Sequence, residues 1–265
     1  MAMVATSQPP VPTPKALSRA LKALLPSDAP APAIAANDDN VNAGSIVTIS
    51  GISVAVVPMP FAIPGETISN ALLHEFMWKD ARETFEKAKG HVLLSILNPE
   101  VDPALQFQNA RILSIVTAAV LSTAKGSGVF WQSADRVLEP ARFAKGAQDI
   151  LKNDMASQLW FSLRFFPGSS NPESPLIVCQ STGLAAFLGR EIECGPYPVS
   201  PADLADKVIV VARYMATSGA VFADGHTLSF GNTKDYDAQI FLDWSSLDGT
   251  NKPIFQLRLR SQEEQ

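Results

Sequence analysis

The chain has 265 residues, of which 46% are hydrophobic and 18% charged, so one large domain or two small ones can bury a core. Its net charge of −5 and its lack of any Lys/Arg-rich run argue against a nucleic-acid partner, because duplex binding usually rests on a basic patch. No apolar stretch reaches the ~20 residues that a membrane-spanning helix needs, and the N-terminal residues lack the features of a secretory signal. We therefore expect a soluble, cytoplasmic protein without membrane contact.

Residues 1–44 differ in composition from the rest of the chain. Their proline- and alanine-rich stretches bury too little apolar surface to offset chain entropy, so we expect a disordered tail. Within this tail, 14–25 has the pattern of a short amphipathic helix, with Thr13 as N-cap and Pro14 in the first turn. It is either a docking helix or, as its shortness favours, a transient helix in a linker.

The spacing of apolar residues and the positions of glycine and proline predict a single folded domain over 45–260. Its first elements are strands in 45–59, a helix over 66–90, a strand over 91–97, a helix over 104–123, a strand over 125–131 and a helix over 139–153. Its later elements are strands over 158–167 and 176–180, a short helix in 181–189, a helix over 199–219, a hairpin over 220–231 and strands over 236–244 and 253–260.

Two of these helices carry specific expectations. In 66–90, the residues Ile68, Leu72 and Phe76 keep helical spacing, which places Phe76 in the apolar stripe. The clearest helix is 199–219, because Ser200 suits the N-cap and Asp203 completes a box-like start. Proline in the first turn agrees with that start.

The order of elements predicts an α+β fold whose sheet is mixed or mostly antiparallel and is covered by helices. A similar order of elements occurs in both halves of the chain and supports a more specific version of this fold. Near residues 128 and 221, a buried helix that follows a strand-like stretch ends at glycine and leads into a strand. Two similar α/β halves sharing one sheet would explain this similarity, and the general frequency of glycine-terminated helices would explain it equally.

Reactive side chains form no recognisable motif. Closely spaced Cys/His pairs are absent, and HEFMW at His74 lacks the second histidine of a zinc-binding HExxH. Neither a GxSxG elbow nor a glycine-rich phosphate loop occurs, so we expect no metal and no cofactor. Cys179 and Cys194 are expected to be reduced thiols, although their spacing leaves a disulfide open.

The remaining candidate catalytic residues are carboxylates and one histidine. Asp224 and His226 lie at the tip of the predicted hairpin and are acid/base candidates. Glu191 and Glu193 share one face of a strand, and the simplest interpretation of this spacing is an exposed acidic face.

Tryptophans are the candidate binding residues, because Trp offers a large rigid area at interfaces. Burial in the core is the commoner explanation for each of them. The four are Trp78, Trp131, Trp160 and Trp244.

Four segments together resemble a known family. They are HVLLSIL, TAAVLSTAKGSGVFW, LWFSLRFF and YMATSGAVFADGHTLSFG. Their order is similar to that in bacterial proteins carrying the domain of unknown function DUF4261, over roughly 52–243. In the last segment, Asp224, Gly225, Thr227 and Gly231 match the turn typical of that family. The resemblance implies a fold family and no established activity.

We expect a non-enzymatic protein-interaction module that binds another, unidentified protein. By association with proteins of this kind, its setting is an immunity or accessory role in a bacterial conflict or secretion system. The alternative is an enzyme of unrecognised type, in which Asp224 and His226 face a pocket. A third option is a structural domain that its N-terminal tail tethers to another protein.

Overall fold

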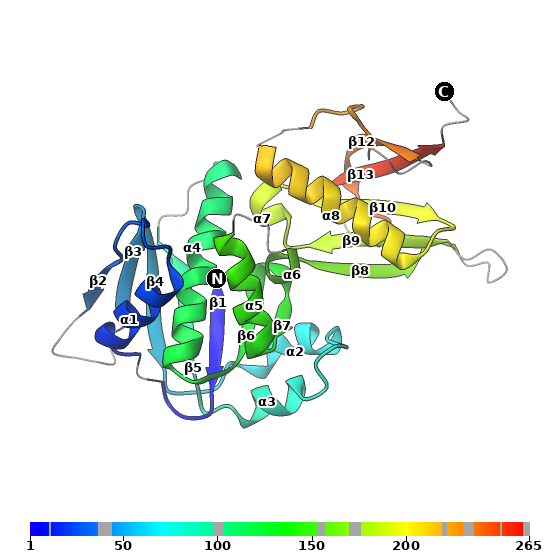
Figure 1. The fold of residues 1–265 in the computed structure, drawn as a ribbon. Helices are drawn as coiled ribbons and strands as arrows, with labels where there is room; N and C mark the ends of the chain where they lie inside the picture. Colours follow the sequence, from blue (N-terminus) through cyan, green and yellow to red (C-terminus); the bar gives the residue numbers. More distant parts are fainter. Residues whose placement is uncertain are drawn as a thin grey trace. The chain divides into compact units, whose positions relative to one another are not determined.

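The computed structural model describes residues 1–10, 12–36, 44–97, 103–152, 157–169, 176–218, 222–229, 236–249 and 251–261. The chain divides into two compact units, unit 1 (Met1–Trp160) and unit 2 (Phe161–Gln265), each with its own sheet (Figure 1). The sequence pattern predicts a single domain over 45–260, whereas the described residues form two units. Of the two explanations left open for the similar order of elements in the two halves, a sheet shared by both does not occur among these residues. Both sheets are mostly antiparallel and carry helices, so the predicted α+β class is confirmed.

Unit 1 is built on a seven-stranded antiparallel sheet of order β2-β3-β4-β5-β1-β6-β7. Its strands are β1 (Ala2–Thr6), β2 (Ala33–Ala36), β3 (Ser45–Ile49), β4 (Ile52–Met59), β5 (Gly90–Ile96), β6 (Gly126–Trp131) and β7 (Arg136–Leu138). Its helices are α1 (Pro14–Leu24), α2 (Gly65–Leu73), α3 (Ala81–Lys87), α4 (Pro103–Thr123), α5 (Pro140–Leu151) and α6 (Ser157–Trp160), with a 3₁₀ turn at Gln132–Ala134.

The N-terminal residues contradict the predicted disordered tail over 1–44. Strand β1 lies between β5 and β6, and Met3 is paired with Leu93 on one side and Phe130 on the other. All five residues of β1 are buried. The prediction of disorder rested on the prolines that follow this strand. The five residues of β1 form a strand because two strands that are distant in the sequence supply their hydrogen-bond partners. Residues 37–43 of the predicted tail lie outside the described part.

Helix α1 forms as its N-cap pattern predicts, but it is part of the core and not a linker. The Thr13 side chain accepts a hydrogen bond from the Ala16 backbone at 3.3 Å, and Pro14 occupies the first turn. Leu17 and Leu21 are fully buried, and the helix packs against α4. Tertiary packing therefore stabilises an 11-residue helix that would be marginal alone.

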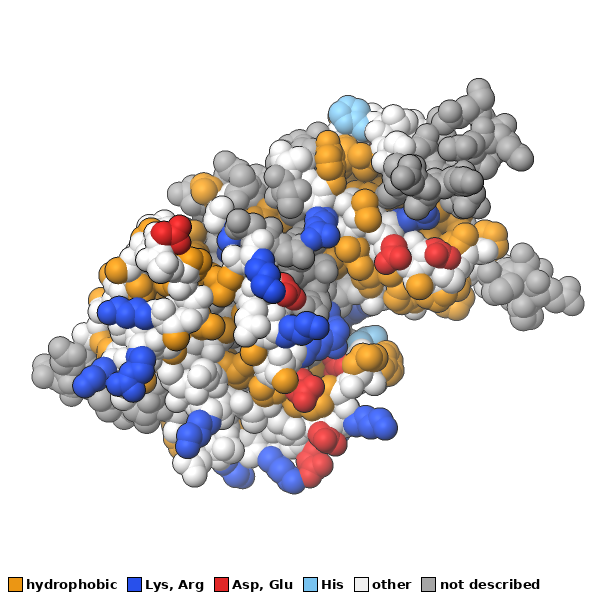
Figure 2. Space-filling model, in the orientation of Figure 1, with side chains coloured by type: hydrophobic (Ala, Val, Ile, Leu, Met, Phe, Trp, Pro, Cys, Tyr) orange, Lys and Arg blue, Asp and Glu red, His pale blue; other side chains and the backbone are white. Residues whose placement is uncertain are grey.

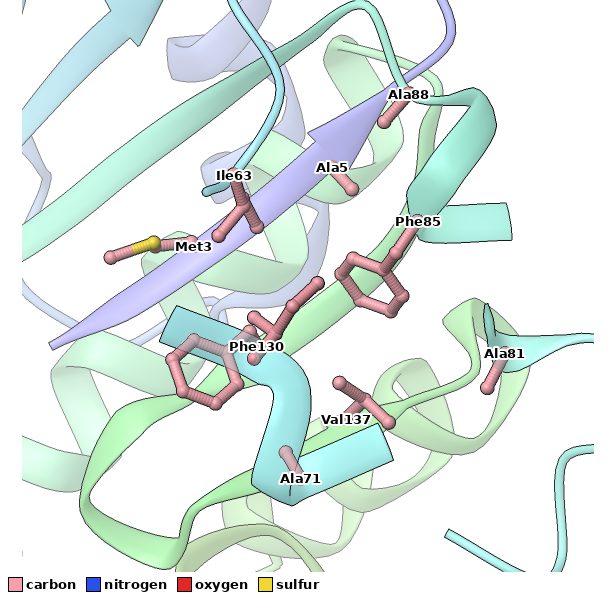
Figure 3. Close-up of a cluster of buried hydrophobic side chains, with 10 residues drawn as sticks. Met3, Ala5, Ile63, Ala71, Ala81, Phe85, Ala88, Phe130 and Val137 are labelled. Carbon is pink, nitrogen blue, oxygen red and sulfur yellow. The ribbon is translucent and has the colours of Figure 1, made fainter. Parts of the chain in front are cut away.

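The predicted helix over 66–90 is two helices, α2 and α3, separated by a loop over 74–80. Both helices pack on one face of the sheet around the side chains of Phe85 and Phe130, as Figure 3 shows. Strand β1 contributes Met3 and Ala5 to the same cluster. The loop between the helices is thus anchored at both ends to a hydrophobic core.

Helix α4 packs against α1, α5 and the sheet. Val116, Ala119 and Val120 are fully buried. Its buried hydroxyls donate to carbonyls one turn back, Ser114 to Ala110 at 2.8 Å and Thr117 to Leu113 at 2.7 Å. These bonds satisfy polar groups that would otherwise be costly to bury.

Unit 2 is built on a six-stranded sheet of order β11-β12-β13-β10-β9-β8, in which only the β10–β13 pair is parallel among the described strands. Its strands are β8 (Ser162–Pro167), β9 (Ile177–Thr182), β10 (Glu191–Tyr197), β11 (Thr227–Ser229), β12 (Tyr236–Ser245) and β13 (Asn251–Ser261). Its helices are α7 (Ala185–Leu188) and α8 (Pro201–Ser218).

Helix α8 packs on β9 and β10 and begins with the predicted cap. The Ser200 hydroxyl accepts from the Asp203 backbone N–H at 3.2 Å and donates to the Asp203 carboxylate at 2.7 Å. Its buried face includes Leu204, Val208 and Val211. Across the described residues of both units, we find no helix with the length and apolar character to cross a bilayer.

Candidate functional site

The acid/base candidates Asp224 and His226 are both exposed in the turn before β11, whereas the enzyme alternative expects them to face a pocket. The Asp224 carboxylate accepts from the Leu242 backbone N–H at 2.8 Å. The His226 Nδ1 atom accepts from the Ala223 backbone N–H at 3.2 Å. Both side chains therefore stabilise the turn at Gly225, whose φ of +79° suits glycine.

The candidate binding tryptophans lie mostly in the core of unit 1. Trp131 and Trp160 are each 2% exposed, so neither offers a surface to a partner. The Trp160 indole N–H donates to the Ser114 hydroxyl at 2.9 Å. Trp78 is half-buried on Phe85, with ring centroids 5.9 Å apart. Trp244 lies in β12, but its side chain is outside the described part of the structure.

The Glu191 carboxylate is buried, which corrects the expected exposed acidic face. It accepts from the Ser181 hydroxyl at 2.5 Å and from three backbone N–H groups, of Gly183 at 2.8 Å, Leu184 at 3.1 Å and Ala185 at 3.2 Å. These N–H groups lie at the start of α7, where backbone N–H groups have no acceptor within the helix. Glu191 therefore fixes the β9–α7 connection.

The Glu193 carboxylate is fully buried one β-period further along β10. It accepts from the Gln180 amide at 2.7 Å, the Ser246 hydroxyl at 2.6 Å and the Leu247 backbone N–H at 3.2 Å. The Gln180 carbonyl oxygen in turn accepts from the Lys252 ammonium at 2.6 Å. This polar centre joins β9, β10 and the turn between β12 and β13. A buried carboxylate needs such donors, because burying it without them is costly.

Metal-binding side chains do not converge in the part of the chain that the structure describes, where no three His, Cys, Asp or Glu residues gather into a possible ion site. His91 is buried and its Nδ1 atom donates to the Phe61 carbonyl at 2.8 Å. Burial lowers the pKa of His91, and the bond to Phe61 partly offsets this effect. The neutral imidazole is a core residue.

The most exposed large apolar side chains of the described residues lie in and beside the α2–α3 loop. Leu73 is 64% exposed, Phe76 81% and Met77 80%, and we call these three residues the apolar loop surface. Figure 2 shows orange side chains at the surface where Figure 1 places the loop after α2. Leaving most of a large apolar side chain in water costs about 1–2 kcal/mol per residue, relative to burying it. Such clusters commonly mark interaction sites.

Polar contacts fix the backbone beneath the apolar loop surface. The Glu75 carboxylate accepts from the backbone N–H groups of Met77 at 2.7 Å and Trp78 at 3.0 Å. His74, at the end of α2, donates from Nδ1 to the Asn70 carbonyl at 2.9 Å. These bonds fix the backbone so that the side chains of Phe76 and Met77 point into solvent and need no packing contacts of their own.

Two further contacts tie the loop to the sheet. The Asn70 side chain donates to the Asp135 carboxylate, which follows the 3₁₀ turn between β6 and β7. The Trp78 ring lies against Gly128 of β6, where an added Cβ would come within 2.9 Å of the ring. The loop is thus held by the rigid core of unit 1, as precise binding sites require.

The sequence interpretation missed this surface because it placed Phe76 in the stripe of one continuous helix. Three large apolar residues in a row, Phe76, Met77 and Trp78, cannot all face one side of a helix. That run was the available signal. Only Trp78 turns toward the core, and the other two face solvent.

Comparison with known proteins finds a match to one family model in unit 2. Residues 180–246, about a quarter of the chain, match the family model described as "Domain of unknown function (DUF4261)". The resemblance to DUF4261 is therefore confirmed over this part of unit 2, a shorter range than the expected 52–243. The matched segment contains Gln180, Glu193 and Ser246. No significant match was found among curated proteins or among solved structures.

Proposed function

We propose that the chain is a non-enzymatic protein-interaction module that binds another protein through the apolar loop surface. The observation that carries the proposal is the exposure of Phe76 and Met77, at 81% and 80%, on a loop whose backbone is already fixed. Full burial of a Phe or Met side chain is worth about 1.5–3 kcal/mol, so the pair supplies about 3–6 kcal/mol of the association energy.

Preorganisation of the loop strengthens this argument. A binding segment that must be ordered on association loses affinity through the entropy of ordering. Here the Glu75 carboxylate and the packed Trp78 ring have already ordered the backbone. A small number of rigid, central apolar anchors is the usual pattern of binding hot spots.

The buried carboxylates support a non-enzymatic function. Glu191 and Glu193 accept hydrogen bonds from backbone N–H groups and buried side chains, so their oxygens are committed to holding the fold. A general base needs an oxygen within reach of the substrate proton. The exposed Asp224 is likewise bound to the β12 backbone.

Site-specific photo-crosslinking in the native cells tests the proposal. A photo-reactive amino acid at position 77 should trap a defined protein, whereas the same group at position 165, a 43% exposed site on β8, should not. Excess unmodified chain should suppress the crosslink, and excess Phe76→Ser chain should not. Identical crosslinks from positions 77 and 165, or equal competition by the two chains, would refute the proposal.

A further inference from the structure

Cys179 and Cys194 lie directly opposite each other on β9 and β10, and nothing in the proposed function uses them. We propose that they form a cross-strand disulfide when the chain folds in contact with an oxidised small thiol such as glutathione disulfide, and that the folded sheet then retains the redox state in which it formed. This is a modification site in unit 2, whereas the apolar loop surface belongs to unit 1.

The register of the two strands places the cysteine backbones within disulfide distance. Residues that face each other in an antiparallel pair have Cα atoms about 4.5 or 5.5 Å apart, depending on whether the pair exchanges hydrogen bonds. Disulfides span Cα–Cα distances of about 4.4–6.8 Å, so both cases suffice. Opposed residues also point to the same face of the sheet, and both cysteines are fully buried there. Formation of the bond therefore needs side-chain rotation and little backbone movement.

Contacts on both sides of the cysteine pair hold the two strands in this register. In the neighbouring pair, the Gln180 amide donates to the Glu193 carboxylate at 2.7 Å. On the other side, Gly195 approaches the β9 backbone so closely that an added Cβ would lie 2.8 Å from the Cα atom of Val178. A register slip of one residue would turn one thiol to the opposite face. These contacts therefore keep the two thiols opposite each other.

The exchange with glutathione disulfide balances in two steps. In the open chain, each thiol loses its proton to solvent near its ordinary pKa of ~8.5. The thiolate of one cysteine attacks a glutathione sulfur, a mixed disulfide forms and one glutathione thiolate leaves. The thiolate of the other cysteine then attacks the cysteine sulfur of the mixed disulfide, and the second glutathione thiolate leaves. The chain loses two electrons and two protons, and glutathione disulfide becomes two glutathione molecules.

Burial stops this chemistry once the sheet has formed. It raises the pKa of both thiols to about 12, so roughly one thiol in 10,000 is ionised at pH 8. Because both residues are fully buried, an external thiolate or disulfide does not reach either sulfur. The same burial protects the disulfide from reduction. The redox state is therefore decided during folding and kept afterwards.

Redox equilibration of the purified full chain tests whether the fold accommodates the bond. Reduced and oxidised chains are each refolded into mixtures of glutathione and glutathione disulfide, quenched with acid and scored by intact mass. The disulfide form is two hydrogens lighter, and the chain has only two cysteines, so that loss in a monomer identifies the bond.

We expect the equilibrium constant for oxidation to be about 100-fold larger in native buffer than in urea. The bond constrains a loop of about 15 residues in the unfolded chain and thereby stabilises the fold, and by linkage the fold stabilises the bond to the same degree. An equal or smaller constant in native buffer overturns the proposal.

A displaced thiol provides the matched control. Cys179→Ala/Thr182→Cys keeps one thiol on β9 and one on β10, but position 182 lies three residues along the strand and on the opposite face of the sheet. This variant should show no gain in native buffer over urea. An equal gain would show that the opposition of Cys179 and Cys194 does not decide the bond, and would overturn the proposal.

The stage at which the bond forms is tested by adding glutathione disulfide at pH 8. A reduced chain that refolds from urea should become oxidised, while a chain that has already folded in the reduced state should stay reduced over the same period. Oxidation of the folded chain as fast as of the refolding chain would contradict retention of the redox state.

Discussion

At the scale of single residues, buried polar groups in unit 2 are held by specific partners. Glu193 is fully buried with side-chain and backbone donors, and its spacing from Glu191 in the sequence pointed instead to a solvated face. The difference arises because the donors come from distant parts of the chain, Gln180 on β9 and Ser246 after β12. A pattern along one strand carries no information about such partners.

Replacement of Glu193 tests this account of the polar centre. Glu193→Ala leaves the Leu247 N–H, the Ser246 hydroxyl and the Gln180 amide without their acceptor. Unsatisfied buried donors cost about 1–3 kcal/mol each, with partial relief from water, so we expect a loss of about 3 kcal/mol in unfolding free energy. The exposed Glu86→Ala on α3 should change it by less than about 0.5 kcal/mol. Equal effects in urea denaturation would contradict the account.

The two cysteines give a pH-dependent prediction. Cys179 and Cys194 are buried free thiols that lie opposite each other on the neighbouring strands β9 and β10. Burial raises the pKa of each thiol to about 12. An unfolded thiol titrates near ~8.5. The folded state therefore binds more protons above that pH, and stability falls as the pH rises from about 8.5 toward 12.

Urea denaturation between pH 8 and 11 checks this sign. The Cys179→Ala/Cys194→Ala chain should lose less stability over that range than the original chain does. At pH 8 both thiols of the folded protein should resist a thiol reagent that modifies them at once in denaturant. A rapid reaction in the folded state would show that the thiols are accessible.

At the scale of elements, the helix starts that depend on neighbouring residues were predicted best from the sequence. The cap of α8 at Ser200 and the cap of α1 at Thr13 form as predicted, because their donors and acceptors lie within three residues. The break between α2 and α3 was missed, because it depends on the Glu75 side chain and on the packing of Trp78 against Gly128. Strand β1 was missed because its partners, β5 and β6, are about 90 and 125 residues away along the chain.

Core substitutions in α1 distinguish a packed element from a tail. Leu17 is fully buried against the core of unit 1, so Leu17→Ala should lower the unfolding free energy by about 2–5 kcal/mol. Leu24, which is half-buried at the end of the same helix, should give a smaller loss when changed to Ala. Thermal unfolding measures both. Negligible effects from Leu17→Ala would restore the transient-linker interpretation.

At the scale of the whole molecule, the described residues form two separate sheets, and the most exposed large apolar side chains among them make up the apolar loop surface. The matched DUF4261 segment lies in unit 2, and the apolar loop surface lies in unit 1. Deletion of residues 1–44 would remove β1 from the middle of the unit 1 sheet, so it does not isolate a tether. Tests of binding must therefore alter surface side chains and leave the sheet intact.

The affinity of the purified chain for the partner trapped at position 77 tests the central claim most directly. Titration calorimetry should show that Phe76→Ser/Met77→Ser weakens binding about 30-fold or more, as expected for loss of about 2 kcal/mol or more at a hot spot. The control Phe165→Ser should bind as the original chain does. Unchanged affinity of the double variant, with an unchanged thermal midpoint, would contradict the account.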